Sequence, residues 1–502
     1  MAAAAAEGNH DETNTTTPIL LNVRGYTSTH RRNATTAKSR TSNGHPIEVS
    51  FTTATPPILS HFSVQCPALE QQEPANYPYM VPKAIAADGQ HFLFRMPVET
   101  IGLPYLSHND YFVYTARPHP HPPRLDLIRK PSHDTLDDNE IAILSCGGDG
   151  EQYVVAALRT IICSTTTFTL HLYRSSSRDD GEEQGVWTCE EVSLEESAMT
   201  RDLVCPIPET ANRQMHHVTS KVILLGGKNG TVGWVDLWRG ILLCDVLLED
   251  EEDSPRKVRD LPLPLPAKGN QRKFLNTSDD HYCRDVTVSR NKDIIKYVEM
   301  EIAPPRIVST TPPGPRESDP FLEWIRCKER PDLKRSLVHG WWKATTWSMP
   351  IPVASWEDWR RDCTAKSTEL TCASDDDNPP AYELLRAMCI DSYKDDDEEA
   401  TSLLLGCLGM AYPAMSMDDD VIFLLTKPTS MERGKAAFLT AVDVRRKMVR
   451  AVAKLDSKKN SMFMRSYLTV RISKHFSATG SLGQAKEHVK KSARRRRPQG
   501  KA

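Results

Sequence analysis

Short apolar runs separated by turn residues constrain the fold of this 502-residue chain more than any other feature. Between Ala84 and Met96, an apolar run stops at Asp88-Gly89 and then restarts, which is typical of a β-hairpin with a tight turn. Similar runs of four to six residues, close to the usual strand length, follow at 111–115, 141–144, 153–158, 168–173, 187–192 and 222–225. This spacing predicts a mainly β protein.

Two distant hairpins share one residue pattern. Val235–Leu242 and Val442–Val449 both read apolar, Asp, apolar, any, Arg, any, apolar, apolar. An Asp at the start of a turn accepts hydrogen bonds from turn amides, so each segment predicts the central hairpin of a propeller blade. A third hairpin of similar size spans Val286–Ile302. Hairpins repeated at long, irregular spacing predict a divergent β-propeller-like repeat of antiparallel hairpins.

The strands beside these turns are apolar on successive residues, as in Ile241–Leu248. Both strand faces are therefore expected to be covered, which blades packed around an axis provide. A β-sandwich or two packed β sheets is the alternative architecture. Short helical insertions are predicted at Pro352–Cys363, where Trp356 and Trp359 follow helical spacing, and at Ala381–Ile390.

Charge is unevenly distributed along the chain, although the formal net charge is only −3. A basic C-terminal segment is balanced by acidic runs, which are predicted to be solvated loops, at 249–253, 375–377, 395–399 and 418–420. We therefore divide the chain into a disordered N-terminal tail (1–17), a β-propeller-like body (18–478) and a disordered basic C-terminal tail (479–502).

The sequence also bears on where the protein resides. No apolar stretch reaches the ~20 residues that a membrane span requires, and the N-terminus lacks the cationic start and apolar core of a secretion signal. The 12 cysteines are scattered without close pairs, which indicates reduced packing residues rather than disulfides. The expected location is cytoplasmic and/or nuclear, with no membrane partner.

Motifs for common catalytic chemistries are absent from the sequence. There is no phosphate-binding Gly-rich loop, and residues 226–230 predict a hairpin turn instead. No Gly-x-Ser-x-Gly elbow presents a nucleophilic serine. His119, His121 and the pair His216-His217 lack Cys or acidic partners at zinc-binding spacing. We therefore expect that the protein is not an enzyme, with no catalytic, cofactor-binding or metal-binding residues and no cofactor.

One long segment carries a resemblance to a known family. Gly233–Leu247 resembles the signature of the plant, grass-expanded domain of unknown function 1618, nearly residue for residue. Arg284–Val288 and Trp342–Ser348 follow in the order that this family shows, and the similarity is densest over residues 233–359. The resemblance implies no catalytic residues, because the family is named for lacking an assigned function.

The leading hypothesis is a non-enzymatic interaction scaffold whose β body binds an unknown protein partner. Trp238 and Arg239 are the candidate interaction residues, since Trp and Arg are favoured at binding hot spots; a turn role for this pair, and a core role for Trp234, are the competing interpretations.

The basic tail supports a second hypothesis, a nuclear protein that associates with nucleic acid through its C-terminus. Short runs of Lys and Arg serve nuclear import or bind polyanions, and the candidate residues are Lys490, Lys491, Arg494, Arg495, Arg496 and Arg497. An unrecognised enzyme, with a site assembled from distant residues, is the third hypothesis.

Overall fold

A computed structural model describes most of the body of the chain and neither of its ends. The described residues are 18–27, 32–67, 81–99, 108–117, 120–128, 136–147, 151–161, 164–175, 185–195, 217–248, 256–272, 279–310, 334–372, 383–386, 405–428, 437–455 and 467–470.

Within these residues, the strands form seven sheets, which we group in chain order into six blades, numbered 1 to 6. Blade 1 contains β1 (Ile19–Asn22), β2 (Tyr26–Thr27), β3 (Ala37–Arg40), β4 (Pro46–Thr52), β5 (His61–Gln65) and β29 (Tyr467–Val470). Blade 2 contains β6 (Lys83–Asp88), β7 (His91–Glu99), β8 (His108–Thr115) and β9 (Arg124–Ile128). Blade 3 contains β10 (Ile141–Cys146), β11 (Gln152–Thr160), β12 (Thr167–Arg174) and β13 (Val186–Leu194).

The second half of the chain continues in the same way. Blade 4 contains β14 (Lys221–Gly226), β15 (Thr231–Asp236), β16 (Gly240–Asp245) and β17 (Lys257–Pro262). Blade 5 contains β18 (Arg284–Val288), β19 (Ile294–Ala303), β22 (Trp341–Pro350) and β23 (Arg360–Lys366), with β20 (Arg306–Thr310) and β21 (Lys334–Val338) inserted as an arm. Blade 6 contains β25 (Leu408–Met415), β26 (Val421–Pro428), β27 (Phe438–Asp443) and β28 (Met448–Lys454), with β24 (Thr371–Cys372) added beside β28.

Helical structure in the described residues is limited to short turns. Five are 3-10 turns: η3 (Asp138–Glu140), η5 (Lys268–Asn270), η6 (Asp280–Tyr282), η7 (Trp356–Asp358) and η8 (Ser367–Glu369).

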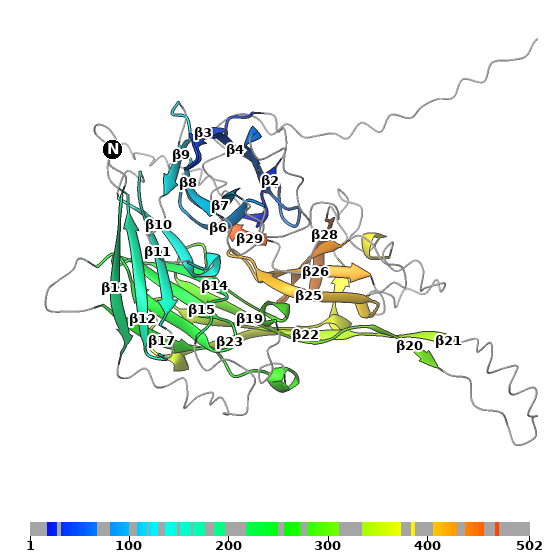
Figure 1. The fold of residues 1–502 in the computed structure, drawn as a ribbon. Helices are drawn as coiled ribbons and strands as arrows, with labels where there is room; N and C mark the ends of the chain where they lie inside the picture. Colours follow the sequence, from blue (N-terminus) through cyan, green and yellow to red (C-terminus); the bar gives the residue numbers. More distant parts are fainter. Residues whose placement is uncertain are drawn as a thin grey trace, which may run out of the picture.

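The blades are arranged as a closed ring. The first strands β6, β10, β14, β18 and β25 contact one another in that order, and β25 contacts β29. Strand β29 pairs antiparallel with β1, and an isolated bridge between Arg24 and Lys83 joins the chain after β1 to the start of β6. Figure 1 shows β29 beside the N-terminal strands. Blade 1 is therefore built from both ends of the described chain, which closes the ring.

Buried apolar side chains gather between neighbouring blades, in six clusters of the described residues. Going round the ring from the interface of blades 1 and 2, these clusters contain the pairs Phe62 and Phe92, Leu93 and Ile143, Leu144 and Trp234, Val235 and Tyr297, Trp342 and Met410, and Phe423 and Leu20. Successive residues of one strand, such as Trp234 and Val235, thus face different neighbours. This explains why the strands are apolar on both faces and confirms the propeller-like prediction.

Blades 3 and 4 are joined more closely than the other pairs. Their outer strands β13 and β17 pair in parallel at Leu194 and Val258, so eight strands form one nearly closed, barrel-like sheet. The sequence did not indicate this junction, because a pairing of two residues leaves no periodic signal.

Several local predictions are confirmed. The hairpin around Asp88-Gly89 joins β6 to β7, residues 226–230 form the turn between β14 and β15, and the runs predicted as strands lie in β8, β10, β11, β12, β13 and β14. The cysteines of the described residues are not joined in disulfides.

The helix predicted at Pro352–Cys363 is wrong. Ser355 caps only the single turn η7, and the chain then continues as β23, because its backbone pairs with β22. The indole of Trp359 donates to the carbonyl oxygen of Pro262 at 2.9 Å. This bond connects the end of the short turn to blade 4. Of the second predicted insertion, residues 383–386 are helical and the rest lies outside the described residues.

Candidate interaction faces of the ring

Up-and-down strand order in blades 2 to 6 gives the ring two different faces. The hairpin face carries the turns between first and second strands and between third and fourth strands, at 89–90, 227–230, 289–293, 416–420 and 444–447. The connector face carries the turns between second and third strands and the connections from blade to blade, including 237–239, η3, η6 and the arm.

On the hairpin face, a lysine joins two blades that are three places apart in the ring. Lys292 Nζ donates to Asp88 Oδ1 at 3.0 Å, from the first turn of blade 5 to that of blade 2. The Lys292 side chain passes Gly226 of blade 4, where an added Cβ would lie 2.8 Å from Lys292 Cδ. Asp88 also accepts the backbone N–H of Ser145 in blade 3 at 3.1 Å. Turns from four blades therefore meet around this ion pair.

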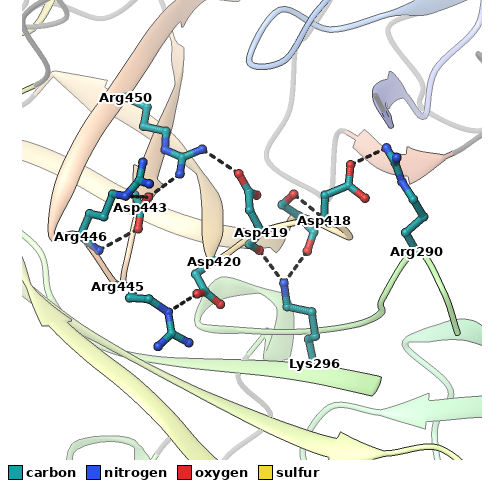
Figure 2. A network of polar contacts seen from close by, with 10 residues as sticks. Arg290, Lys296, Asp418, Asp419, Asp420, Asp443, Arg445, Arg446 and Arg450 are labelled. Atoms are coloured by element: carbon teal, nitrogen blue, oxygen red, sulfur yellow. Dashed lines mark hydrogen bonds and ion pairs between the residues drawn. The ribbon is translucent and has the colours of Figure 1, made fainter. Parts of the chain in front are cut away.

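The acidic run Asp418–Asp420 forms the first turn of blade 6, in the network that Figure 2 shows. Arg290 donates to Asp418 at 2.6 Å, Arg450 donates to Asp419 at 2.7 Å, and Arg445 donates to Asp420. Each carboxylate of the run therefore has its own arginine. The run is a partly exposed turn, as predicted, and arginines from other segments neutralise its charges.

Lys296 holds the same turn from blade 5. Its Nζ donates to the carbonyl oxygens of Ser416 and Asp419, at 3.1 and 2.5 Å (Figure 2). Burial lowers the pKa of Lys296, while the nearby carboxylates of Asp420 and Asp419 oppose that shift. The network thus joins blade 5 to blade 6, and its carboxylates are paired with arginines.

Beneath the connector face, blade 5 contains a buried ion pair whose arginine also bonds to blade 4. The fully buried Arg284 donates from Nη2 to Glu299 Oε1 at 2.7 Å and from Nη1 to the carbonyl oxygen of Leu237 at 2.8 Å. Glu299 also accepts the side-chain amide of Asn270 at 2.9 Å. A buried pair that loses one partner leaves an uncompensated charge, at a cost of about 3–5 kcal/mol. The sequence signal for this centre was charge inside apolar strands, at Arg284 and Glu299.

This ion pair explains where the candidate residue Trp238 lies. Its ring centroid is 4.2 Å from the guanidinium carbon of Arg284, and only 3% of Trp238 is exposed. Arg239 beside it is half-buried. Trp234 is fully buried and donates from its indole to the carbonyl oxygen of Glu140 at 2.7 Å. The pair Trp238-Arg239 therefore forms a turn over an ion pair, and the Trp238 side chain is not on the surface.

An exposed aromatic side chain, unlike the buried Trp238, lies on β22 at the base of the arm. Strands β20 and β21 continue the pairing of β19 and β22 beyond the blade, from Arg306 opposite Val338 to Thr310 opposite Lys334. Figure 1 shows this pair of strands extending away from the ring. At its base, Val338 is 41% exposed and Trp341 is 49% exposed.

The predicted tail sites cannot be placed on the ring, because Lys490, Lys491 and Arg494–Arg497 lie outside the described residues, as do both tails of the predicted domain division. Within the part of the chain that is described, no three His, Cys, Asp or Glu side chains are grouped as a metal site. Among the same residues, no helix has the length and apolar character to span a membrane.

Fold and faces together define a propeller-like β protein with a projecting two-stranded arm and an exposed tryptophan at the base of that arm. Residues 234–423 match the model of the family described as "Protein of unknown function (DUF1618)". The match begins in β15 and ends in β26, so it includes the arm and the buried pair of Arg284 and Glu299.

Other comparisons add little to this assignment. No curated protein matches the sequence. Among solved structures, the chain is similar to the GH93 alpha-L-arabinofuranosidase of Fusarium graminearum in complex with arabinobiose, with 8% identity and a TM-score of 0.23. That alignment covers 88% of this chain and 98% of the arabinofuranosidase chain.

Proposed function

We propose that this protein is a non-enzymatic scaffold that binds a protein partner on the connector face of the ring, with the arm as its main contact element. The exposed indole of Trp341 is the observation that carries the proposal. Tryptophan is enriched among the few residues that dominate binding energy, where its large surface is buried by the partner. Val338 and Trp341 are both exposed at the base of the arm, and exposed apolar side chains can mark an interaction site.

The neighbouring Trp342 contrasts with the exposed Trp341. Trp342 follows Trp341 on β22, and its side chain is buried between blades 5 and 6. Strand alternation places the two indoles on opposite faces. The blade therefore needs only one of the two tryptophans for its core, and Trp341 is left available to a partner.

The test is partner capture from cell extract with the full chain and the variant Trp341→Ala. We expect this variant to bind the partner at least about 30-fold more weakly than the unaltered chain does. A Trp hot spot contributes about 2 kcal/mol or more to the binding free energy. Val186→Ala, which alters a 71% exposed valine of β13 in blade 3, is the matched control and should capture normally.

A chain ending at Gly483 and nuclease treatment complete the experiment. Both should leave capture unchanged if the ring carries the binding site. Loss of all partners on truncation or nuclease treatment, with no effect of Trp341→Ala, would contradict the scaffold proposal. That outcome would favour the basic tail as the part of the chain that binds.

A further inference from the structure

The ion pair of Lys292 and Asp88, which we call the latch, links opposite sides of the hairpin face. Blades 5 and 2 lie opposite one another in a ring of six, and the two residues belong to the turns that follow their first strands. The pair is 3.0 Å long, and its side chains are 31% and 16% exposed. The latch is therefore partly open to water and to salt.

The turn that carries the lysine has a strained backbone. Lys292 has a φ of 57°, in the left-handed region that residues other than glycine seldom adopt. The Lys292 amide donates to the carbonyl oxygen of Ser289 at 3.0 Å, and the Ser289 amide donates to that of Ile294 at 2.9 Å. Strain of this kind persists only where the surrounding structure imposes it, and it is concentrated at functional positions.

Blade 4 leaves a path for the lysine side chain. Gly226 has a φ of 75°, and a Cβ added there would lie 2.8 Å from Lys292 Cδ. A larger residue would thus be strained itself and would displace the lysine from its path to blade 2.

Blade 3 fixes the carboxylate at the other end of the latch. Ser145 donates its backbone N–H to Asp88 Oδ2 at 3.1 Å and its hydroxyl to the Asp88 carbonyl oxygen at 2.6 Å. The hydroxyl oxygen of Ser145 is also 2.8 Å from Nδ1 of the buried His91. Because Oδ2 is held by blade 3, Asp88 presents Oδ1 to the lysine.

We propose that the latch is a salt-sensitive conformational switch that closes the hairpin face of the ring. The ion pair favours the closed state, whereas the left-handed turn at Lys292 relaxes when the pair separates. Salt at about 1 M shortens the screening length to about 3 Å, from about 10 Å at 0.1 M, and so shifts the balance toward the open state. The inference goes beyond the proposed function, because Trp341 belongs to the connector face.

Hydrogen exchange of the full chain, localised by mass spectrometry, measures the opening, since amides exchange when their segment opens. Asp88→Asn removes one charge and keeps an acceptor for the Ser145 amide. Lys292→Met keeps the apolar stem and removes the ammonium group. At about 0.1 M salt, each variant should exchange about fivefold faster than the unaltered chain in segments 88–92 and 289–293.

Salt and the double variant test whether the two residues act as one unit. Raising salt to about 1 M should accelerate exchange of both segments in the unaltered chain about fivefold, and should change Asp88→Asn by less than about twofold. The chain with both substitutions should exchange no faster than either single variant, because each substitution removes the same contact.

Two controls separate the switch from general destabilisation. Lys228→Met alters an exposed lysine in the first turn of blade 4, and it should leave both segments unchanged. Exchange of β27 in blade 6 should stay the same in every variant. The inference is overturned if neither single variant exchanges faster in the two segments, if salt acts equally on Asp88→Asn, or if β27 accelerates as much as the turns do.

Discussion

At the scale of single residues, Glu140 is the carboxylate whose surroundings change its chemistry most clearly. It ends η3 at the start of blade 3, and its backbone carbonyl accepts the indole N–H of Trp234. Burial, with a smaller contribution from the charge of Asp137, raises the pKa of Glu140 from 4.5 to about 7. The folded protein therefore binds this proton more tightly than the unfolded chain does.

The sign of the pH dependence follows from that shift. Stability from the protonated Glu140 is fully present below about pH 4.5 and is lost as pH rises through about 7. We expect Glu140→Gln to raise the free energy of unfolding at pH 8 by about 1–3 kcal/mol relative to the unaltered chain. Urea denaturation at pH 5 and pH 8 measures this, and the gain should be much smaller at pH 5.

Glu357→Gln, which alters an exposed carboxylate of η7, is the control and should change stability by less than about 0.5 kcal/mol at either pH. Equal stability of Glu140→Gln and the unaltered chain at pH 8 would show that the buried carboxylate is not destabilising when charged.

At the scale of elements, the repeated Asp pattern predicts the turn itself but not which strands of a blade the turn joins. Asp236 Oδ1 accepts the backbone N–H groups of Trp238 and Arg239, at 2.9 and 3.0 Å, and Asp443 accepts that of Arg446 at 2.8 Å. The first turn joins the second and third strands of blade 4, as expected. The second joins the third and fourth strands of blade 6, which corrects the prediction that both are central hairpins.

Asp236 also ties its turn to the chain that enters blade 4, since Oδ2 accepts the N–H of Val218 at 3.1 Å. We expect Asp236→Ala to lower the free energy of unfolding by about 2–4 kcal/mol, because it leaves buried amides without an acceptor. Chemical denaturation measures the loss. The exposed turn variant Asp293→Ala should cost less than about 1 kcal/mol, and an equal loss for both would mean that burial of the turn is unimportant.

At the scale of the whole molecule, stability depends on closing the ring. Strand β29 pairs with β1 over four residues, and Val470 is buried with the core between blades 1 and 2. No other strand of the described chain completes the inner edge of blade 1. The C-terminal end of the body is therefore a structural part of the N-terminal blade.

Truncation tests this closure directly. A chain ending at Leu455 should lose about 3–5 kcal/mol of unfolding free energy, because roughly four backbone hydrogen bonds and one buried side chain are removed. A chain ending at Gly483 keeps β29 and should unfold at the same temperature as the full chain. Identical thermal unfolding of both truncated chains would contradict closure by β29.

Local information determined much of what could be read from the sequence. Strand positions, the Asp88-Gly89 hairpin and the burial of Trp234 follow from apolar periodicity and turn chemistry, which act between residues close in the chain. The family signature is equally local, and residues 234–423 bear it out. These features were available before any tertiary structure.

Only the tertiary structure decided how distant residues meet. Lys292 and Asp88 are 204 positions apart, and nothing in either segment marks the other as its partner. The same holds for Arg284, which lies against the buried ring of the candidate interaction residue Trp238. Such contacts depend on the order and packing of the blades around the axis. That arrangement is determined by the packing of the whole core and not by any short sequence pattern.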